Sequence, residues 1–166
     1  MSNENTGVFV DAGTIKNSPI GQELSDDQCT ALSQVVSAHG LSNGMFLLEE
    51  GHKDDAIYII TKGTLEVVKP TAGGEWVTLH MLRPGDMAGA LGFIDGVEHS
   101  AAIRAMNNSE VFSLTRPDLE AFLAKDPDLV YKVMRAIVRT VHAILRRMNT
   151  QFVEMSNYIS HQHGRY

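Results

Sequence analysis

Two short segments carry residue types that could hold an anionic ligand. The first, Gly89-Ala90-Leu91-Gly92-Phe93, predicts one helical turn between two strands. Backbone N–H groups at the start of such a turn bind anions well. The second, His99-Ser100-Ala101, adds an imidazole, a hydroxyl and another backbone amide. The predicted ligand-binding residues are Gly89, Ala90, Leu91, His99, Ser100 and Ala101. A glycine that only shapes a corner of the fold is the alternative for Gly89.

The histidines form no metal-binding or catalytic pattern. Between residues 45 and 115, His52, His80 and His99 occur singly, without the ligand spacing of a metal site. His161 and His163 have metal-ligand spacing, but they fall in a predicted tail with no third ligand nearby. The sequence also has no nucleophile elbow, Walker loop or paired carboxylates. We therefore expect no metal and no enzymatic activity.

The composition is that of an ordinary globular domain. The 166 residues are 43% hydrophobic and 20% charged, with a net charge of −6, which argues against an extended phosphate-binding surface. The single cysteine, Cys29, excludes an intrachain disulfide, and no run of 18 apolar residues could span a membrane. Because the start lacks a signal-peptide pattern, we expect a cytoplasmic protein.

From Met45 to Thr115 the sequence is typical of short strands. Segments rich in Ile, Val, Leu or aromatic residues alternate with turn signals that contain Gly, Pro, Asn or Asp. The predicted strands are Met45–Glu49, Ala56–Thr61, Thr64–Lys69, Glu75–Leu82, His99–Met106 and Glu110–Thr115. This spacing predicts an antiparallel jelly roll, not alternating βαβ units. Gly51, Gly63 and Gly85 fall where tight turns need a positive φ.

An N-terminal helix should precede the strands. Residues 1–20 are predicted to form an arm that is partly disordered or packs late. Ser25 and Gln28 have capping-box spacing, so a helix should begin there, and Gly40 should end it. Its apolar face would consist of Leu24, Leu32, Val35 and Val36.

Two helices should follow the strands. Thr115-Arg116-Pro117-Asp118 predicts a helix start, and Asp126-Pro127 opens a second helix that reaches about Ser160. The fold class is therefore α+β, an antiparallel β-roll flanked by an N-terminal helix and a long C-terminal dimerisation helix. We expect the domain to comprise residues 21–125, the long helix 126–160 and a tail 161–166.

The long helix has an apolar seven-residue repeat. Its columns interleave as a and d positions, so two copies should pair as a parallel homodimer. One column is Met134, Val141, Met148 and Met155; the other is Val130, Ile137, Ile144, Gln151 and Tyr158. A third column widens the stripe with Val138, Leu145, Phe152 and Ile159. The predicted interface is Met134, Ile137, Val141, Ile144, Met148 and Met155. A helix that faces only the core of its own chain is the alternative.

The stretch from Gly44 to Arg104 resembles the cyclic-nucleotide-binding domain family of catabolite-activator-type regulators, kinase regulatory subunits and gated channels. The matching residues are Gly51, Tyr58, Ile60, Gly63, Leu65, Val67, Leu82, Gly85, Asp86, Gly89, Leu91, Ser100, Ala101 and Arg104. The resemblance covers roughly residues 22–160. It implies a β-roll with a dimer helix, and a phosphate-binding cassette at Gly89 for a cyclic nucleotide or related anionic ligand.

Two charged positions of the family cassette are replaced in this chain. By this resemblance, Ala90 stands where a glutamate holds the ribose 2′-hydroxyl, and His99 where an arginine pairs with the cyclic phosphate. The hydroxyl positions that meet adenine in catabolite activators fall on Ile144 and Leu145. Losing a hydrogen bond to a charged group costs about 1.5–3 kcal/mol, and losing a phosphate's charged partner about 2–5 kcal/mol. Together they weaken binding roughly 10³- to 10⁵-fold, so cyclic AMP should bind weakly or not at all.

The sequence thus predicts a non-enzymatic regulatory module. One hypothesis is a dimeric sensor of a nucleotide or small anion with a hydrated pocket. The other is a ligand-free protein–protein interaction dimer, whose vestigial pocket is filled by side chains such as Met87 or Phe93. The chain ends at Tyr166, where catabolite-activator-type regulators continue into a helix-turn-helix module, so we expect a protein partner and no direct DNA binding. We interpret the basic residues of the long helix as a solvated face; they are Lys132, Arg135, Arg139, Arg146 and Arg147.

Overall fold

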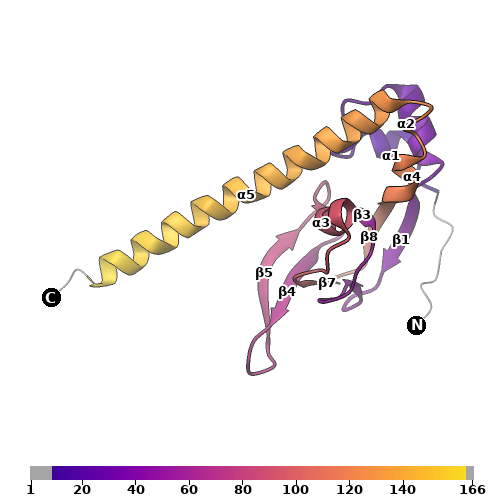
Figure 1. Cartoon of the computed structure of the whole chain (residues 1–166). Helices are drawn as coiled ribbons and strands as arrows, with labels where there is room; N and C mark the ends of the chain where they lie inside the picture. The colour runs from indigo at the N-terminus through magenta and orange to yellow at the C-terminus, as the bar shows by residue number, and fades with distance from the viewer. Residues whose placement is uncertain (1–8, 164–166) are drawn as a thin grey trace.

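The strands of the computed structural model, which describes residues 9–163, form two facing antiparallel sheets, a β-roll (Figure 1). Each sheet has four strands, in the orders β1-β8-β3-β6 and β2-β7-β4-β5. The strands are β1 (Ser37–Leu41), β2 (Phe46–Leu48), β3 (Ala56–Lys62), β4 (Leu65–Pro70), β5 (Trp76–Leu82), β6 (Met87–Ala88), β7 (Ala102–Ala105) and β8 (Ser109–Thr115). The antiparallel jelly-roll prediction is therefore confirmed, and all six predicted strands are present.

The predicted end of the first helix is wrong. Helix α2 covers Asp26–Ser33, and the chain then enters β1, where Gly40 pairs with Glu110 of β8. Val35 and Val36, expected on the helix face, lie between the two elements and are half-buried against the core. The reason is tertiary: β8 offers an edge to which residues 37–41 can bond, and this pairing outweighs local helix propensity.

The start of α2 and the segment before it are well defined. Ser25 Oγ accepts from Gln28 N (3.2 Å) and Gln28 Oε1 accepts from Ser25 N (3.0 Å), which confirms the capping box. Instead of an arm, residues 9–20 include helix α1 (Ala12–Lys16), and Ile15 and Ile20 are fully buried. The rest of the expected arm, residues 1–8, lies outside the described residues.

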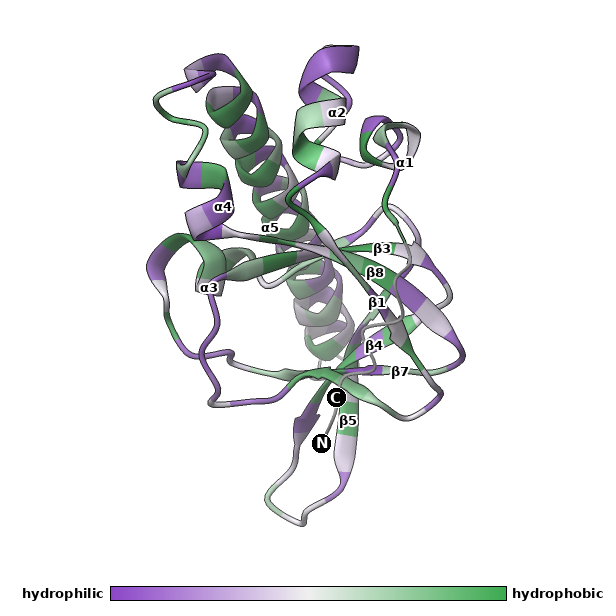
Figure 2. Ribbon diagram, turned by 90° about the vertical axis from the view of Figure 1, so that its right-hand side faces the viewer, coloured by the Kyte–Doolittle hydropathy of each residue, from purple (hydrophilic) through white to green (hydrophobic). Residues whose placement is uncertain are grey.

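The two faces of sheet β1-β8-β3-β6 contribute to two separate cores. Along β3, Ile57 and Ile59 face the helices, whereas Tyr58 and Ile60 face the interior of the roll, as the period of a strand requires. Figure 2 shows α1, α2, α4 (Arg116–Glu120) and the start of α5 gathered on the outer side of this sheet. Thr115 Oγ1 caps α4 by accepting from Asp118 N (3.2 Å), which confirms that predicted helix start.

Helix α5 spans Pro127–His163, so it continues past the predicted end at Ser160. Its first turns complete the helix-facing core, where Leu129, Val133 and Ile137 have no exposed surface. Ile137 was predicted to lie in a dimer interface, and this is wrong because the sheet of its own chain covers it. The alternative of a core-facing helix thus holds for this first part of α5. Further along, α5 still contacts β5 as far as Arg147, whose side chain bonds to His80, and its C-terminal end extends away from the sheets (Figure 1).

The described residues contain no helix apolar enough over a sufficient length to cross a membrane. They also contain no group of three histidine, cysteine or acidic residues placed to hold a metal. His161, from the predicted tail, is in α5, and its Nδ1 hydrogen-bonds with the backbone O of Asn157 (2.8 Å).

Candidate ligand-binding site

The predicted glycine turn is present and lies tightly against β3. Gly89 is the N-cap of helix α3 (Ala90–Asp95) and has a φ of +82°. A Cβ at Gly89 would lie 2.7 Å from the backbone O of Ala56 and 3.3 Å from Tyr58 Cδ2. Both the left-handed backbone and this close approach therefore require glycine. Because α3 begins here, the N–H groups of Ala90 and Leu91 have no intrahelical acceptor and remain available to a ligand.

His99 is brought to this turn, but its imidazole is enclosed. The side chain is only 8% exposed, and its Cε1 would lie 3.1 Å from a Cβ on Gly92. The ring Nε2 is 3.2 Å from Asp54 Oδ1, at an angle that makes no hydrogen bond. Within the described chain, Nε2 is thus a buried nitrogen without a hydrogen-bond partner. The backbone of His99 is also engaged, since its N–H donates to the O of His52 (2.9 Å).

Asp54 and Tyr58 complete this cluster; Asp54 was not predicted as a site residue, and Tyr58 was identified only as a residue that matches the family pattern. Asp54 Oδ2 accepts from the Tyr58 hydroxyl (2.9 Å). Burial, and then the hydrogen bond to Asp54, raise the pKa of Tyr58 well above its ordinary value, so the hydroxyl stays protonated and donates. Asp54 belongs to a loop that reads only as a turn, 45 positions before His99. Only the folded chain places the two together.

The other predicted residues lie at the rim of this site. Leu91 is 59% exposed and Ser100 is also exposed, whereas Ala90 and Ala101 are half-buried. The Ser100 backbone O accepts from Lys69 Nζ (3.1 Å). The fold therefore brings the two predicted segments together through the Gly92–His99 contact, but residues 9–163 supply no unpaired cation between them.

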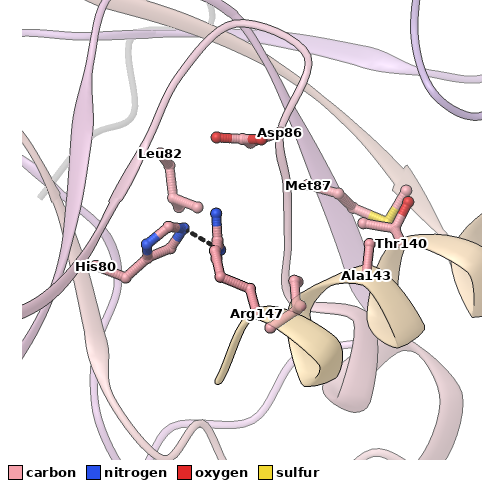
Figure 3. A pocket seen from close by; sticks show the side chains of 8 residues that line it. His80, Leu82, Asp86, Met87, Thr140, Ala143 and Arg147 are labelled. Carbon is pink, nitrogen blue, oxygen red and sulfur yellow. Dashed lines mark hydrogen bonds between the residues drawn. The ribbon is translucent and has the colours of Figure 1, made fainter. Parts of the chain in front are cut away.

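A second feature is a cavity of about 130 Å³ between β5 and α5 (Figure 3). The lining residues are His80, Leu82, Asp86, Met87, Thr140, Ala143, Ile144 and Arg147. Ile144 is half-buried here, on the side of α5 that faces the roll. Arg147 was expected on a solvated face, but its guanidinium donates to His80 Nε2 (2.7 Å). Burial, and then the charge of Arg147, lower the pKa of His80, so neutral His80 accepts this bond.

Met87 and Phe93, the side chains expected to fill a vestigial pocket, are both buried. They belong to the helix-facing core, in which Phe93 has 1% and Met87 4% exposure. Met87 also lines the cavity beside α5.

Both the sequence and the fold of this chain are similar to those of known proteins. The sequence profile of the cyclic nucleotide-binding domain matches residues 39–126. The chain belongs to this family. The α3 turn and His99–Ala101, the two segments predicted to form the ligand-binding cassette, both fall inside the matched residues.

Individual relatives are distant. An uncharacterized NTE family protein of Mycobacterium bovis is 29% identical over 125 residues, which cover 75% of this chain but only 21% of that protein. A cyclic nucleotide-binding domain from Methylobacillus flagellatus KT has a TM-score of 0.74 at 23% identity, covering 80% of this chain and 74% of that one. The regulatory subunit of a cAMP-independent protein kinase A from Trypanosoma brucei has a TM-score of 0.65 at 21% identity, covering 80% and 47%. These two structural likenesses show a shared cyclic nucleotide-binding fold.

Proposed function

We propose that this chain is a dimeric, non-enzymatic regulatory module, a sensor of a nucleotide or small anion whose cassette does not bind cyclic AMP tightly. One observation carries the proposal. At the two positions where, by the resemblance, the family cassette has a charged side chain, this chain has Ala90, which has no polar side-chain atom, and His99, which is buried beside Asp54. The backbone of the α3 turn is retained, so the site keeps its amides without its charged anchors.

The Trypanosoma relative supports this interpretation. That kinase subunit is described as cAMP-independent and has the same fold. A variant of it with three substitutions has been solved bound to cAMP. A corresponding experiment, with substitutions in the cassette, can be made on this chain.

Isothermal titration calorimetry tests the proposal directly. Wild-type protein should bind cyclic AMP with a Kd weaker than about 10 μM, and Ala90→Glu with His99→Arg should strengthen binding by restoring the two charged contacts. Ile94→Glu with His99→Arg is the matched control, because Ile94 is an exposed residue of the same helix. A wild-type Kd of about 10 μM or tighter would contradict the proposal.

A ligand-free interaction module is the second candidate, and the enclosure of His99 favours it. A thermal-shift screen against cyclic mono- and dinucleotides separates the two candidates. A ligand at 100 times its Kd adds about 2.7 kcal/mol of stability and raises the melting temperature. The sensor requires at least one such ligand, whereas the interaction module predicts none.

A further inference from the structure

Asp54 places a carboxylate inside the cassette. Its Oδ1 lies 3.4 Å from the position that a Cβ would take on Gly92, in the first turn of α3, and 3.2 Å from His99 Nε2. The Tyr58 hydroxyl holds the other oxygen, Oδ2, at 2.9 Å. Since Gly92 has no side chain, this carboxylate lies close to the first turn of α3, with the His99 ring beside it.

The other charged side chains near Asp54 are paired with different partners. In the same two loops, Lys53 pairs with Glu98 (3.9 Å) and His52 pairs with Glu49 (2.9 Å), and all four side chains are largely exposed. His99 is the one basic side chain that contacts Asp54 in the described chain, at a geometry that forms no hydrogen bond. An anion at the α3 turn would therefore meet a like charge at short range in a partly buried setting, where solvent screens charges less than at the surface.

We propose that Asp54 is the residue that sets the selectivity of this cassette, by disfavouring the cyclic phosphate of cyclic AMP at the α3 turn. This inference rests on the proposed function, because it concerns the same site. It adds an active repulsion to the missing anchors at Ala90 and His99. Specificity commonly needs such a repulsive element in addition to the absence of an attractive one.

The test compares Asp54→Asn with Asp55→Asn. Asparagine has the shape of aspartate and still accepts from the Tyr58 hydroxyl, so the cluster should keep its geometry. Asp55 is the adjacent half-buried residue and has no contact with His99, so its substitution removes the same charge without touching the cassette. Cyclic AMP and adenosine are the two probes, because adenosine has the same base and ribose without the charged phosphate.

NMR titration up to millimolar probe gives the affinities. Asp54→Asn should bind cyclic AMP at least about tenfold more tightly than wild type and Asp55→Asn, while its affinity for adenosine should change by less than about threefold. An Asp54→Asn variant that binds cyclic AMP no better than Asp55→Asn would overturn the inference. So would an equal gain for adenosine, which would indicate a change of shape instead of charge.

The same data separate this inference from the proposed function. A wild-type protein that binds cyclic AMP at about 10 μM or tighter contradicts the proposed function, whatever the ratio between the variants. Weak wild-type binding together with an unchanged ratio contradicts only the role of Asp54. If Asp54→Asn lowers the melting temperature, the ratio of cyclic AMP to adenosine affinity within each variant remains interpretable, because both probes meet the same folded population.

Discussion

Met148→Asp should dissociate the proposed dimer without harming the β-roll. Met148 is 58% exposed on α5, directly after Arg147, whose side chain bonds to His80 of β5. The same stretch of helix exposes a run of large apolar side chains at 51% or more: Leu145, Met148, Phe152, Val153, Met155, Tyr158 and Ile159. In a parallel pair of helices Met148 meets its symmetry mate, and a partner is the simplest means of covering such a stripe.

The magnitude follows from the exposed fraction. Complete burial of an apolar side chain contributes about 1.5–3 kcal/mol, and with 58% of Met148 still to be covered its share is about 1–2 kcal/mol. Two-fold symmetry doubles this to about 2–4 kcal/mol, because each substitution acts on both chains. Two unpaired carboxylates facing one another cost about 1–3 kcal/mol each in addition. The dimer should weaken by more than about 4 kcal/mol, or roughly a thousandfold in Kd.

Light scattering at micromolar concentration measures the effect. Wild type should have twice the mass of the 18.2 kDa chain, and Met148→Asp should have the mass of one chain. Asn157→Asp is the matched control, because nine residues place it on the opposite side of the helix from Met148, where it is exposed. The melting temperature of the β-roll should be similar in Met148→Asp and Asn157→Asp. A monomeric wild type, or a Met148→Asp variant that stays dimeric, would refute the reasoning.

Two further predictions concern stability. Gly63 and Gly74 both have a positive φ, but their surroundings differ. A Cβ on Gly63 would lie 2.2 Å from Ser109 Oγ and 2.8 Å from the Asn108 backbone O. A Cβ on Gly74 would meet no atom within 4 Å. Gly74→Ala should therefore cost about 1–2 kcal/mol for the backbone alone, and Gly63→Ala about 1–3 kcal/mol more; equal urea midpoints would contradict this. Burial, and then the charge of Arg147, lower the pKa of His80 in the folded chain, so the imidazole binds its second proton more tightly in the unfolded chain. The stability that neutral His80 contributes is therefore complete above the ordinary imidazole pKa near 6.5 and declines as the pH falls below it. His80→Gln should thus reduce the loss of unfolding free energy between pH 7.5 and 5.5, and the exposed His142→Gln should not; identical pH profiles would show that His80 is uninvolved.

Local signals in the sequence predicted most of the fold. The Ser25 capping box, the turn glycines and the alternating strands depend on neighbours within a few positions, and each is present in the structure. Strand β1 was missed because Ser37–Leu41 has little strand propensity of its own. It is a strand because β8 pairs with it, and such long-range pairing leaves no periodic mark in the sequence.

The heptad pattern correctly identified the apolar face of α5, but it did not predict which surface covers each part of that face. Ile137 and Met148 belong to the same apolar stripe, yet one is fully buried in its own chain and the other is 58% exposed. Periodicity identifies an apolar face but not what covers it. The point at which the sheet stops and the free helix begins depends on the placement of α5, which only the folded chain defines.

At the candidate site, too, the sequence pattern did not predict which groups surround a residue. The sequence identified the α3 turn and His99, but the consequence of having a histidine there depends on Asp54, from a distant loop. An imidazole facing solvent could attract a phosphate when protonated, whereas one held beside a carboxylate offers an incoming anion little net positive charge. The substitution of arginine by His99 therefore cannot be interpreted alone.

Two buried side chains next to the α3 turn, Phe93 and Met87, connect it to α5. Phe93 of α3 packs in one core with Ile137, and Met87, two residues before Gly89, lines the cavity that Thr140 and Ala143 close from the helix side. Any ligand or substitution that displaces the α3 turn must therefore move side chains that touch α5, since a close-packed core transmits small shifts. Beyond that contact, α5 is held to the roll by the bond between Arg147 and His80. A change in the cassette would thus reach the exposed stripe through a helix that is also bonded to the roll by the charge-assisted hydrogen bond from Arg147 to His80.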